Sequence, residues 1–416
     1  MQEPAYSRYF TIAQNASVAA VLLFLPVSYR VCSICIFVLL GLTLLRALVE
    51  RQRLVFFRQV PFWISSAVIW ISLVGLLYTS DMKHGLGVIE TAGSLILFPI
   101  IFNQTGITDL QFEKIKRTFI AIISLVIIVL ESRILWLVIT TEEKRVFSYY
   151  YTYENLTAGY VAQPVYFGVY VVLVNVFCLS MILKSKVVRD RILLTLLIIG
   201  NSVFLFQLAA RATMVLNFAI IPLYLAWVIY IQRKWLLGTM VIALVALFAV
   251  LMYNFSTFAR LRMESAFIEL TADNLKQADP YSRMLIWPCA WDIFKANWIA
   301  GVGTGDSENA LREMYQQRGL NELYEAGLNA HNQYLTFLVR HGLLGFAAIF
   351  LTILLPLYYA IRTRNIEAAL FTLLMAGFFM TENVLGRVQG VIFFAFFQAI
   401  FVILTYRGAS SSGRSQ

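Results

Sequence analysis

Three side chains in the polar parts of this sequence have the chemistry of a group-transfer site. His331 is one of only three histidines in the chain, and a neutral imidazole beside a hydroxyl group is a good general base at physiological pH. Arg211 and Arg283 carry planar guanidinium groups whose paired donors suit a diphosphate. We therefore predict that these three residues form the catalytic set. Two alternatives remain open: a structural role for His331 and a membrane-anchoring role for Arg211.

His331 and Arg283 must be positioned by the longest polar interruption of the chain, residues 254–330 and the segment that follows. Large apolar residues recur there at steps of three and four, which predicts one apolar stripe on a helix that begins at Arg283. The members of this stripe are Met284, Trp287, Trp291, Phe294 and Trp298. Such a helix either lies along the outer membrane surface or packs on its neighbours. A second helix is predicted to open at His331 and to break near His341-Gly342.

The glycine-rich segment Gly301-Val302-Gly303-Thr304-Gly305 lies between these two predicted helices. It lacks the lysine and the strand–helix context of a phosphate-binding loop, so we expect a flexible turn. Asp81 and His84 have no further ligand at a suitable spacing, so a metal site is not expected.

The rest of the chain has the composition of a membrane protein. Apolar residues make up 60% and charged residues 13% of the sequence, whereas soluble domains carry roughly 25% charged residues. Segments of about 20 apolar residues, long enough to cross a hydrocarbon core of roughly 30 Å, recur along the chain. They predict an all-α polytopic membrane protein with about twelve transmembrane helices. The predicted spans are 10–26, 29–48, 61–79, 85–103, 117–140, 163–183, 190–208, 212–231, 235–253, 343–361, 366–384 and 388–406.

Lysine and arginine set the predicted orientation. They concentrate in the short segments on the side of the N-terminus, which places both termini in the cytoplasm and the polar insert outside. The net charge of +10 then reflects topology, and nucleic acid is not an expected partner. The predicted division is 1–253 for nine transmembrane helices, 254–342 for a periplasmic loop with interfacial helices, and 343–416 for the last three transmembrane helices and a cytoplasmic tail. We expect residues 408–416 to be disordered.

Other polar and aromatic residues have structural explanations. Cys32 and Cys35 lack a second pair for a metal site, and all four cysteines are expected to be structural. Glu382 and Arg387 flank the last outside turn and are expected to pair with each other. The tyrosine-rich segment 141–162 is either an aromatic belt at the membrane interface or a surface on which sugars stack.

Several motifs, taken in order, resemble the O-antigen ligase/polymerase superfamily. They are Arg283-x3-Trp287-x3-Trp291, the glycine-rich segment 301–305, His331-Asn332-x2-Leu335, and Gly342-Leu-Leu-Gly345. Arg211, within Ala-Arg-Ala-Thr, resembles the arginine-bearing turn of the family, which more often reads Ser-Arg-Gly. By motif the resemblance covers roughly residues 200–345. It implies a GT-C-like, inverting glycosyltransferase of the bacterial inner membrane, with a large helical periplasmic loop and an active site that faces the periplasm.

The resemblance also implies substrates and residue roles. The donor is an O-antigen glycan on undecaprenyl diphosphate, and Arg211 and Arg283 bind its diphosphate while His331 acts as the base. Asn332, Tyr334 and Arg387 are further candidates for contacts with substrate. Neither a metal nor another cofactor is expected.

A ligase that uses lipid A-core as acceptor is favoured, because the chain ends after the twelfth predicted helix. A polymerase or a protein O-oligosaccharyltransferase of the same superfamily remains open, as does a transporter or flippase for a lipid-linked sugar. Against the transporter, the insert is off-centre and outside. A non-catalytic scaffold in envelope assembly is the least favoured alternative.

Overall fold

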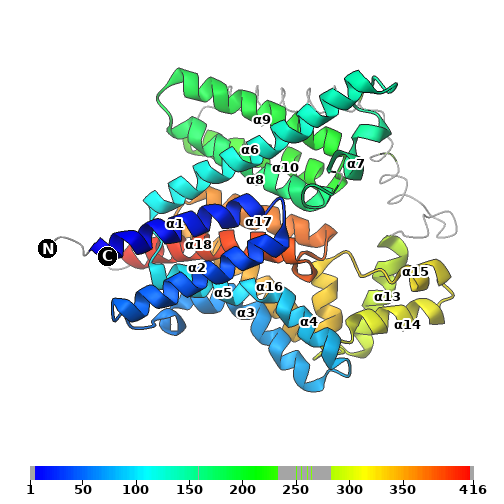
Figure 1. Ribbon diagram of the computed structural model, residues 1–416. Helices are drawn as coiled ribbons and strands as arrows, with labels where there is room; N and C mark the ends of the chain where they lie inside the picture. Colours follow the sequence, from blue (N-terminus) through cyan, green and yellow to red (C-terminus); the bar gives the residue numbers. More distant parts are fainter. Residues whose placement is uncertain are drawn as a thin grey trace. The chain divides into compact units, whose positions relative to one another are not determined.

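The computed structural model describes residues 5–157, 159–232 and 283–412, together with the single positions 250, 254, 260 and 264. These residues form helices and turns, with no strand among them (Figure 1). In this part of the chain, eight helices are long and apolar enough to cross a membrane. The prediction of an all-α polytopic membrane protein is therefore confirmed. The predicted span 235–253 lies outside the described residues except for position 250, so the number of twelve stays a prediction.

The described helices fall into two compact units. The first comprises the described residues within Met1–Val18, Ile34–Asp109 and Phe267–Gln416, and the second those within Ala19–Ser33 and Leu110–Ala266. Helices α1 (Ala5–Phe24) and α2 (Tyr29–Val49) have residues in both units. The predicted three-part division follows membrane topology, and it stays a prediction.

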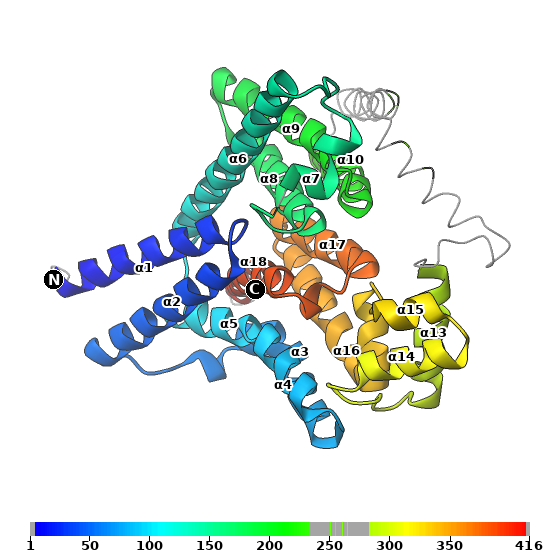
Figure 2. The ribbon, with the colours of Figure 1, turned by 45° about the vertical axis from the view of Figure 1, so that its right-hand side comes forward.

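The first unit is built around α16 (Gln333–Arg362), which packs against helices from distant parts of the sequence (Figure 2). Its partners are α3 (Val60–Gly75), α13 (Arg283–Ala296), α14 (Ser307–Gln317), α17 (Ile366–Thr381) and α18 (Val388–Ser412). Helices α4 (Met82–Ala92), α5 (Ser94–Thr105) and α15 (Asn321–Ala326), with the short 3-10 helices η1 (Phe56–Arg58), η2 (Leu76–Tyr78) and η5 (Val384–Gly386), complete it. Helix α18 continues to Ser412, so the expectation of disorder was wrong for residues 408–412.

The second unit contains α6 (Asp109–Thr140), η3 (Tyr149–Tyr151), α7 (Tyr153–Thr157), α8 (Pro164–Lys184), α9 (Val188–Leu208) and α10 (Arg211–Gln232). A buried amide network joins α8 to α9 and α10. Asn175 Nδ2 donates to Asn217 Oδ1 at 2.9 Å, and Asn201 Nδ2 donates to Asn175 Oδ1 at 2.9 Å. Buried amides need such partners, and interhelical hydrogen bonds of this kind hold membrane helices in register.

The helix that follows the polar insert starts and bends close to the predicted positions. Asn332 is the N-cap of α16, because its Oδ1 accepts hydrogen bonds from the backbone of Tyr334 and Leu335 at 3.0 and 3.1 Å. The helix thus begins two residues after His331. At Gly342 the backbone leaves the helical region, with φ 59° and ψ −147°. The predicted break near His341-Gly342 is confirmed.

Candidate active site in the first unit

The break in α16 is one of the places where the polar insert is attached to the membrane helices. Interrupting the helix releases backbone groups that would otherwise bond within it. The carbonyl of Val339 accepts a hydrogen bond from Val302 N at 2.9 Å, and that of Arg340 accepts one from Gly303 N at 3.0 Å. In return, Leu343 N donates to the carbonyl of Trp298 at 2.8 Å. Three backbone hydrogen bonds therefore fix the 298–303 segment on the break.

The glycine-rich segment 301–305 forms a turn, as predicted, and it is tightly packed. A Cβ on Gly301 would lie 2.3 Å from the carbonyl carbon of Arg340, and one on Gly305 would lie 2.0 Å from the carbonyl oxygen of Asp81. Between them, Thr304 donates its hydroxyl to the carbonyl of Ser72 at 2.6 Å. Only glycine fits where two backbones approach this closely. The glycine-rich segment therefore connects the break in α16 directly to the end of α3.

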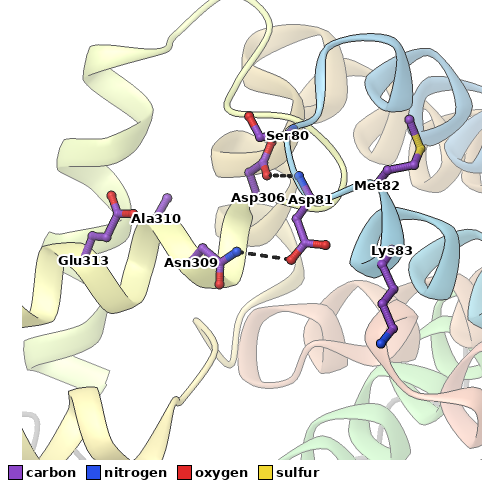
Figure 3. Close-up of a pocket in the computed structure, with 8 residues that line it drawn as sticks. All are labelled: Ser80, Asp81, Met82, Lys83, Asp306, Asn309, Ala310 and Glu313. Carbon is purple, nitrogen blue, oxygen red and sulfur yellow. Dashed lines mark hydrogen bonds between the residues drawn. The ribbon is translucent and has the colours of Figure 1, made fainter.

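Asp306 follows the glycine-rich segment directly and binds the turn between η2 and α4 (Figure 3). Its carboxylate accepts hydrogen bonds from the hydroxyl of Thr79 and from the backbone N–H groups of Ser80 and Asp81, at 2.9, 2.7 and 2.8 Å. Burial raises the pKa of Asp306, but these donors outweigh it and the pKa is lowered on balance. Asp81 in turn caps α4 by accepting from His84 N at 2.9 Å. Asp81 and Asp306 line a cavity of about 650 Å³, and both thus have structural roles.

Helix α13 begins at Arg283 in the described chain, and the face that it buries overlaps only part of the predicted stripe. The buried residues on this helix include Ile286, Cys289 and Ile293, which pack with residues of α14, α15 and α16. By contrast, Trp291 is 46% exposed and Trp298 is 53% exposed. The predicted stripe is therefore divided: Phe294 is buried and Trp287 packs against the buried core, whereas Trp291 and Trp298 are exposed.

Hydrogen bonds hold the backbone of His331 and of the residues directly before and after it. The indole N–H of Trp287 donates to the carbonyl of Ala330 at 3.0 Å, and Asn329 Oδ1 accepts from His331 N at 2.9 Å. The cap at Asn332 fixes the next residue. His331 itself has a φ of 43°, in the left-handed region that residues with a Cβ avoid. Strain of this kind persists only where the surroundings impose it, and it occurs often at functional sites.

Glu382 connects His331 to Arg283. It ends α17, and its Oε2 lies 3.4 Å from Nδ1 of His331, while its Oε1 lies 3.7 Å from Nη2 of Arg283. Arg283 also donates from Nη2 to the carbonyl of Thr381 at 2.8 Å. The structure therefore brings two of the predicted catalytic residues to one carboxylate. The expected pair between Glu382 and Arg387 was wrong, because among the described residues Arg387 makes no ion pair and its side chain is exposed.

This arrangement has the elements of base catalysis. A carboxylate that accepts a hydrogen bond from Nδ1–H holds a histidine in the tautomer whose Nε2 can take a proton. The side chains of His331 and Arg283 are 33% and 40% exposed, so both are accessible, while Glu382 is only 17% exposed. Sequence reasoning missed Glu382 as a site residue. The only local signal was a carboxylate at the end of an apolar helix, which is costly there without a function.

The other predicted substrate contacts in this unit already have intramolecular hydrogen bonds. Asn332 uses its side-chain oxygen as the helix cap and is 8% exposed. Tyr334 donates its hydroxyl to the carbonyl of Ala376 at 3.0 Å. Their contacts with substrate, and those of Arg387, stay predictions.

Arg211 belongs to the second unit, where it opens α10. Ala209 before it has a φ of 49° and ends α9, and Thr213 donates its hydroxyl to the carbonyl of Ala210 at 2.9 Å. Gln207 Nε2 donates to the carbonyl of Tyr151 at 3.3 Å, which ties the tyrosine-rich segment to this end of α9. Three tyrosines of that segment are exposed: Tyr149, Tyr150 and Tyr160. Whether they form a membrane belt or a sugar surface remains a matter of prediction, as does the position of Arg211 relative to His331.

Comparison with known proteins agrees with the resemblance in the motifs. Residues 192–350 match the family model described as O-antigen ligase. No curated protein matches the chain. The matched segment begins near the start of α9 and includes Arg211, Arg283, His331 and the break at Gly342. The family implies glycosyltransferase-like activity on lipid-linked sugars in a membrane. With eight helices of membrane-spanning length and composition among its described residues, the chain is thus a multi-pass membrane protein in which residues 192–350 match the O-antigen ligase family model.

Proposed function

We propose that the protein transfers an O-antigen glycan from undecaprenyl diphosphate to a sugar hydroxyl of lipid A-core at the periplasmic face of the bacterial inner membrane. The observation that carries this proposal is the contact of one carboxylate, Glu382, with both His331 and Arg283. It supports the proposal because it joins a base to a cation that suits an anionic leaving group.

In this reaction His331 takes the proton of the acceptor hydroxyl on its Nε2. The acceptor oxygen then forms a bond to the anomeric carbon of the glycan, and the bond from that carbon to the diphosphate oxygen breaks. Undecaprenyl diphosphate leaves with the electron pair of the broken bond. Attack from the face opposite the diphosphate inverts the anomeric configuration.

For Arg283 we propose contact with the diphosphate and stabilisation of the charge that develops on it, and for Arg211 the resemblance implies the same role. Such stabilisation is effective when donors are oriented before the reaction. Glu382 orients the imidazole of His331 and is a positioning residue. The two guanidinium groups do the work that a divalent cation does in many diphosphate-using enzymes, so the reaction is independent of metal.

The test uses full-length protein in detergent with purified undecaprenyl-diphosphate-linked glycan and lipid A-core. We expect product from the wild type and none from His331→Ala, with both proteins showing the same thermal unfolding. Near-normal transfer by His331→Ala rejects the base assignment. The absence of product from the wild type with lipid A-core, with the lipid-linked glycan and with a protein acceptor alike favours a transporter, since detergent removes the two compartments between which a transporter works.

Two further measurements separate the remaining alternatives. Electrophoresis of lipopolysaccharide from a deletion strain should show lipid A-core without glycan, whereas lipid A-core with a single repeat indicates a polymerase. Activity should persist in EDTA. A loss that only Mg²⁺ or Mn²⁺ restores indicates an acidic metal site instead.

A further inference from the structure

A second polar cavity lies in the first unit, beside the turn that follows Glu382. Its volume is about 290 Å³. Its walls come from four segments: His84, Gly87 and Thr91 of α4, Glu308 of α14, Arg340 of α16, and Gly386 of η5. We call it the Arg340 cavity. One water molecule occupies roughly 30 Å³ in the liquid, so the cavity has room for several waters or for one sugar unit.

Arg340 is the unusual member of this cavity, because it is a buried cation whose guanidinium forms no ion pair with the described residues. Its side chain is 3% exposed, and its Nε donates to the hydroxyl of Ser307 at 2.9 Å. No other hydrogen bond or ion pair of its guanidinium is formed with the described residues. Glu308, the acidic residue that lines the cavity, interacts with Arg340 through its charge, and its Oε2 lies 3.8 Å from Nε2 of His84. Buried charges are costly unless they are paired, so a guanidinium with unused terminal donors is a ready site for an anion.

The Arg340 cavity borders the turn that follows Glu382, the residue that contacts His331. Leu385 and Gly386 border the cavity, and Glu382, four residues before Gly386, holds His331. The turn between them is fixed, because Leu385 N donates to Oε1 of buried Gln333 at 2.6 Å. A molecule anchored in the Arg340 cavity therefore lies beside the same turn as the base.

From this geometry we infer that the Arg340 cavity binds an oxyanion, a phosphate or a carboxylate, carried by a sugar of the acceptor. The planar fork of Arg340 takes the oxyanion, and His84 and Thr91 offer polar groups to the same sugar unit. The identity of the bound molecule as acceptor rests on the proposed function. The binding of an anionic saccharide at this cavity does not rest on the proposed function.

Gly87 provides a way to fill the cavity without touching Arg340. It lies on the same face of α4 as His84 and Thr91, and a Cβ at this position meets no atom within 4 Å. Gly87→Leu should therefore occupy the cavity, and Gly87→Ala is its matched control. Arg340→Lys keeps the charge but removes the planar fork.

The experiment measures acceptor binding and transfer with full-length protein in detergent. Purified lipid A-core is compared before and after phosphatase treatment, and binding is measured without donor. We expect Gly87→Leu and Arg340→Lys to raise KM and Kd for the untreated acceptor by roughly tenfold or more. The kcat should stay within about twofold, and Gly87→Ala should behave as wild type.

The phosphatase arm identifies the anion. A treated acceptor that binds the wild type as weakly as it binds Gly87→Leu shows that the oxyanion is a phosphate. If treatment changes nothing while both variants still bind weakly, the oxyanion is a carboxylate, and amidation of the acceptor should then abolish the difference. Unchanged KM and Kd in both variants overturn the inference. A wild type that binds acceptor through this cavity but forms no product rejects the proposed function and leaves the cavity assignment standing.

Discussion

Replacing Glu382 by glutamine tests whether the carboxylate orients the base. The change keeps the shape of the side chain but removes its charge, and its amide can donate to Nδ1 of His331. The imidazole proton then moves to Nε2, which can no longer accept a proton from the acceptor. General-base catalysis contributes roughly 10² to 10⁴ in rate. Because Oε2 lies 3.4 Å from Nδ1, at the long end for a hydrogen bond, we expect the low end, a fall in kcat of about 10²-fold.

A fall of this size corresponds to about 2.7 kcal/mol in the activation free energy. The assay is the rate of glycan transfer in detergent at saturating donor and acceptor. Glu382→Asp keeps the charge at a shorter reach and should recover part of the rate. Glu325→Gln is the control, because Glu325 is exposed on α15 and makes no ion pair with the described residues.

The reasoning is refuted if Glu382→Gln keeps a kcat within about twofold of the wild type. A lower melting temperature with an unchanged kcat gives Glu382 a structural role only. An equal loss in Glu382→Gln and Glu382→Asp, with both proteins folded, shows that the position of the carboxylate matters more than its charge.

Three further predictions concern stability, measured by thermal unfolding in detergent. Gly301→Ala should cost more than about 2 kcal/mol, because a Cβ there collides with the backbone of Arg340, whereas Gly319→Ala, with φ 68° but open surroundings, should cost about 1 kcal/mol. Burial raises the pKa of Asp306, but the N–H and O–H groups that donate to its carboxylate lower this pKa on balance. The contribution of Asp306 to the free energy of unfolding is therefore complete above the pKa that the residue has in the unfolded chain. It is lost as the pH falls through the lower pKa of the folded protein. Asp306→Asn should be less stable than the wild type at pH 7 by about 1–2 kcal/mol, and this difference should shrink on acidification; a difference independent of pH contradicts this. Asn175→Leu should cost about 1–2 kcal/mol, because it leaves its two amide partners on α9 and α10 unsatisfied; an unchanged melting temperature assigns the network no energetic role.

The parts of the fold that depend on local sequence could be predicted. Runs of apolar residues predicted the all-helical membrane architecture, and the helix from Arg283 followed from the recurrence of large residues at helical steps. The break near Gly342 could be predicted because glycine in a helix interior is unfavourable and often has a special backbone conformation. These signals all lie within a few residues of the feature that they describe.

The errors came from contacts between segments that are distant in sequence. The buried side of α13 carries Ile286, Cys289 and Ile293, and the packing of α14, α15 and α16 selects it over Trp291, which is exposed. The tight fit of Gly301 depends on Arg340, and the partner of Glu382 depends on where His331 lies. No periodicity or spacing within one segment carries that information.

The attachment of the polar insert at the break in α16 has a consequence for how specificity can change. The hydrogen bonds that fix the 298–303 segment join main-chain atoms, and the closest contacts involve glycine. Side chains in the walls of the Arg340 cavity can therefore be exchanged without breaking these main-chain bonds, and the walls include none of the side chains that hold His331, which are Trp287, Asn329, Asn332 and Glu382. A new acceptor then requires changes in the walls of the cavity, while the frame that holds the base is inherited intact.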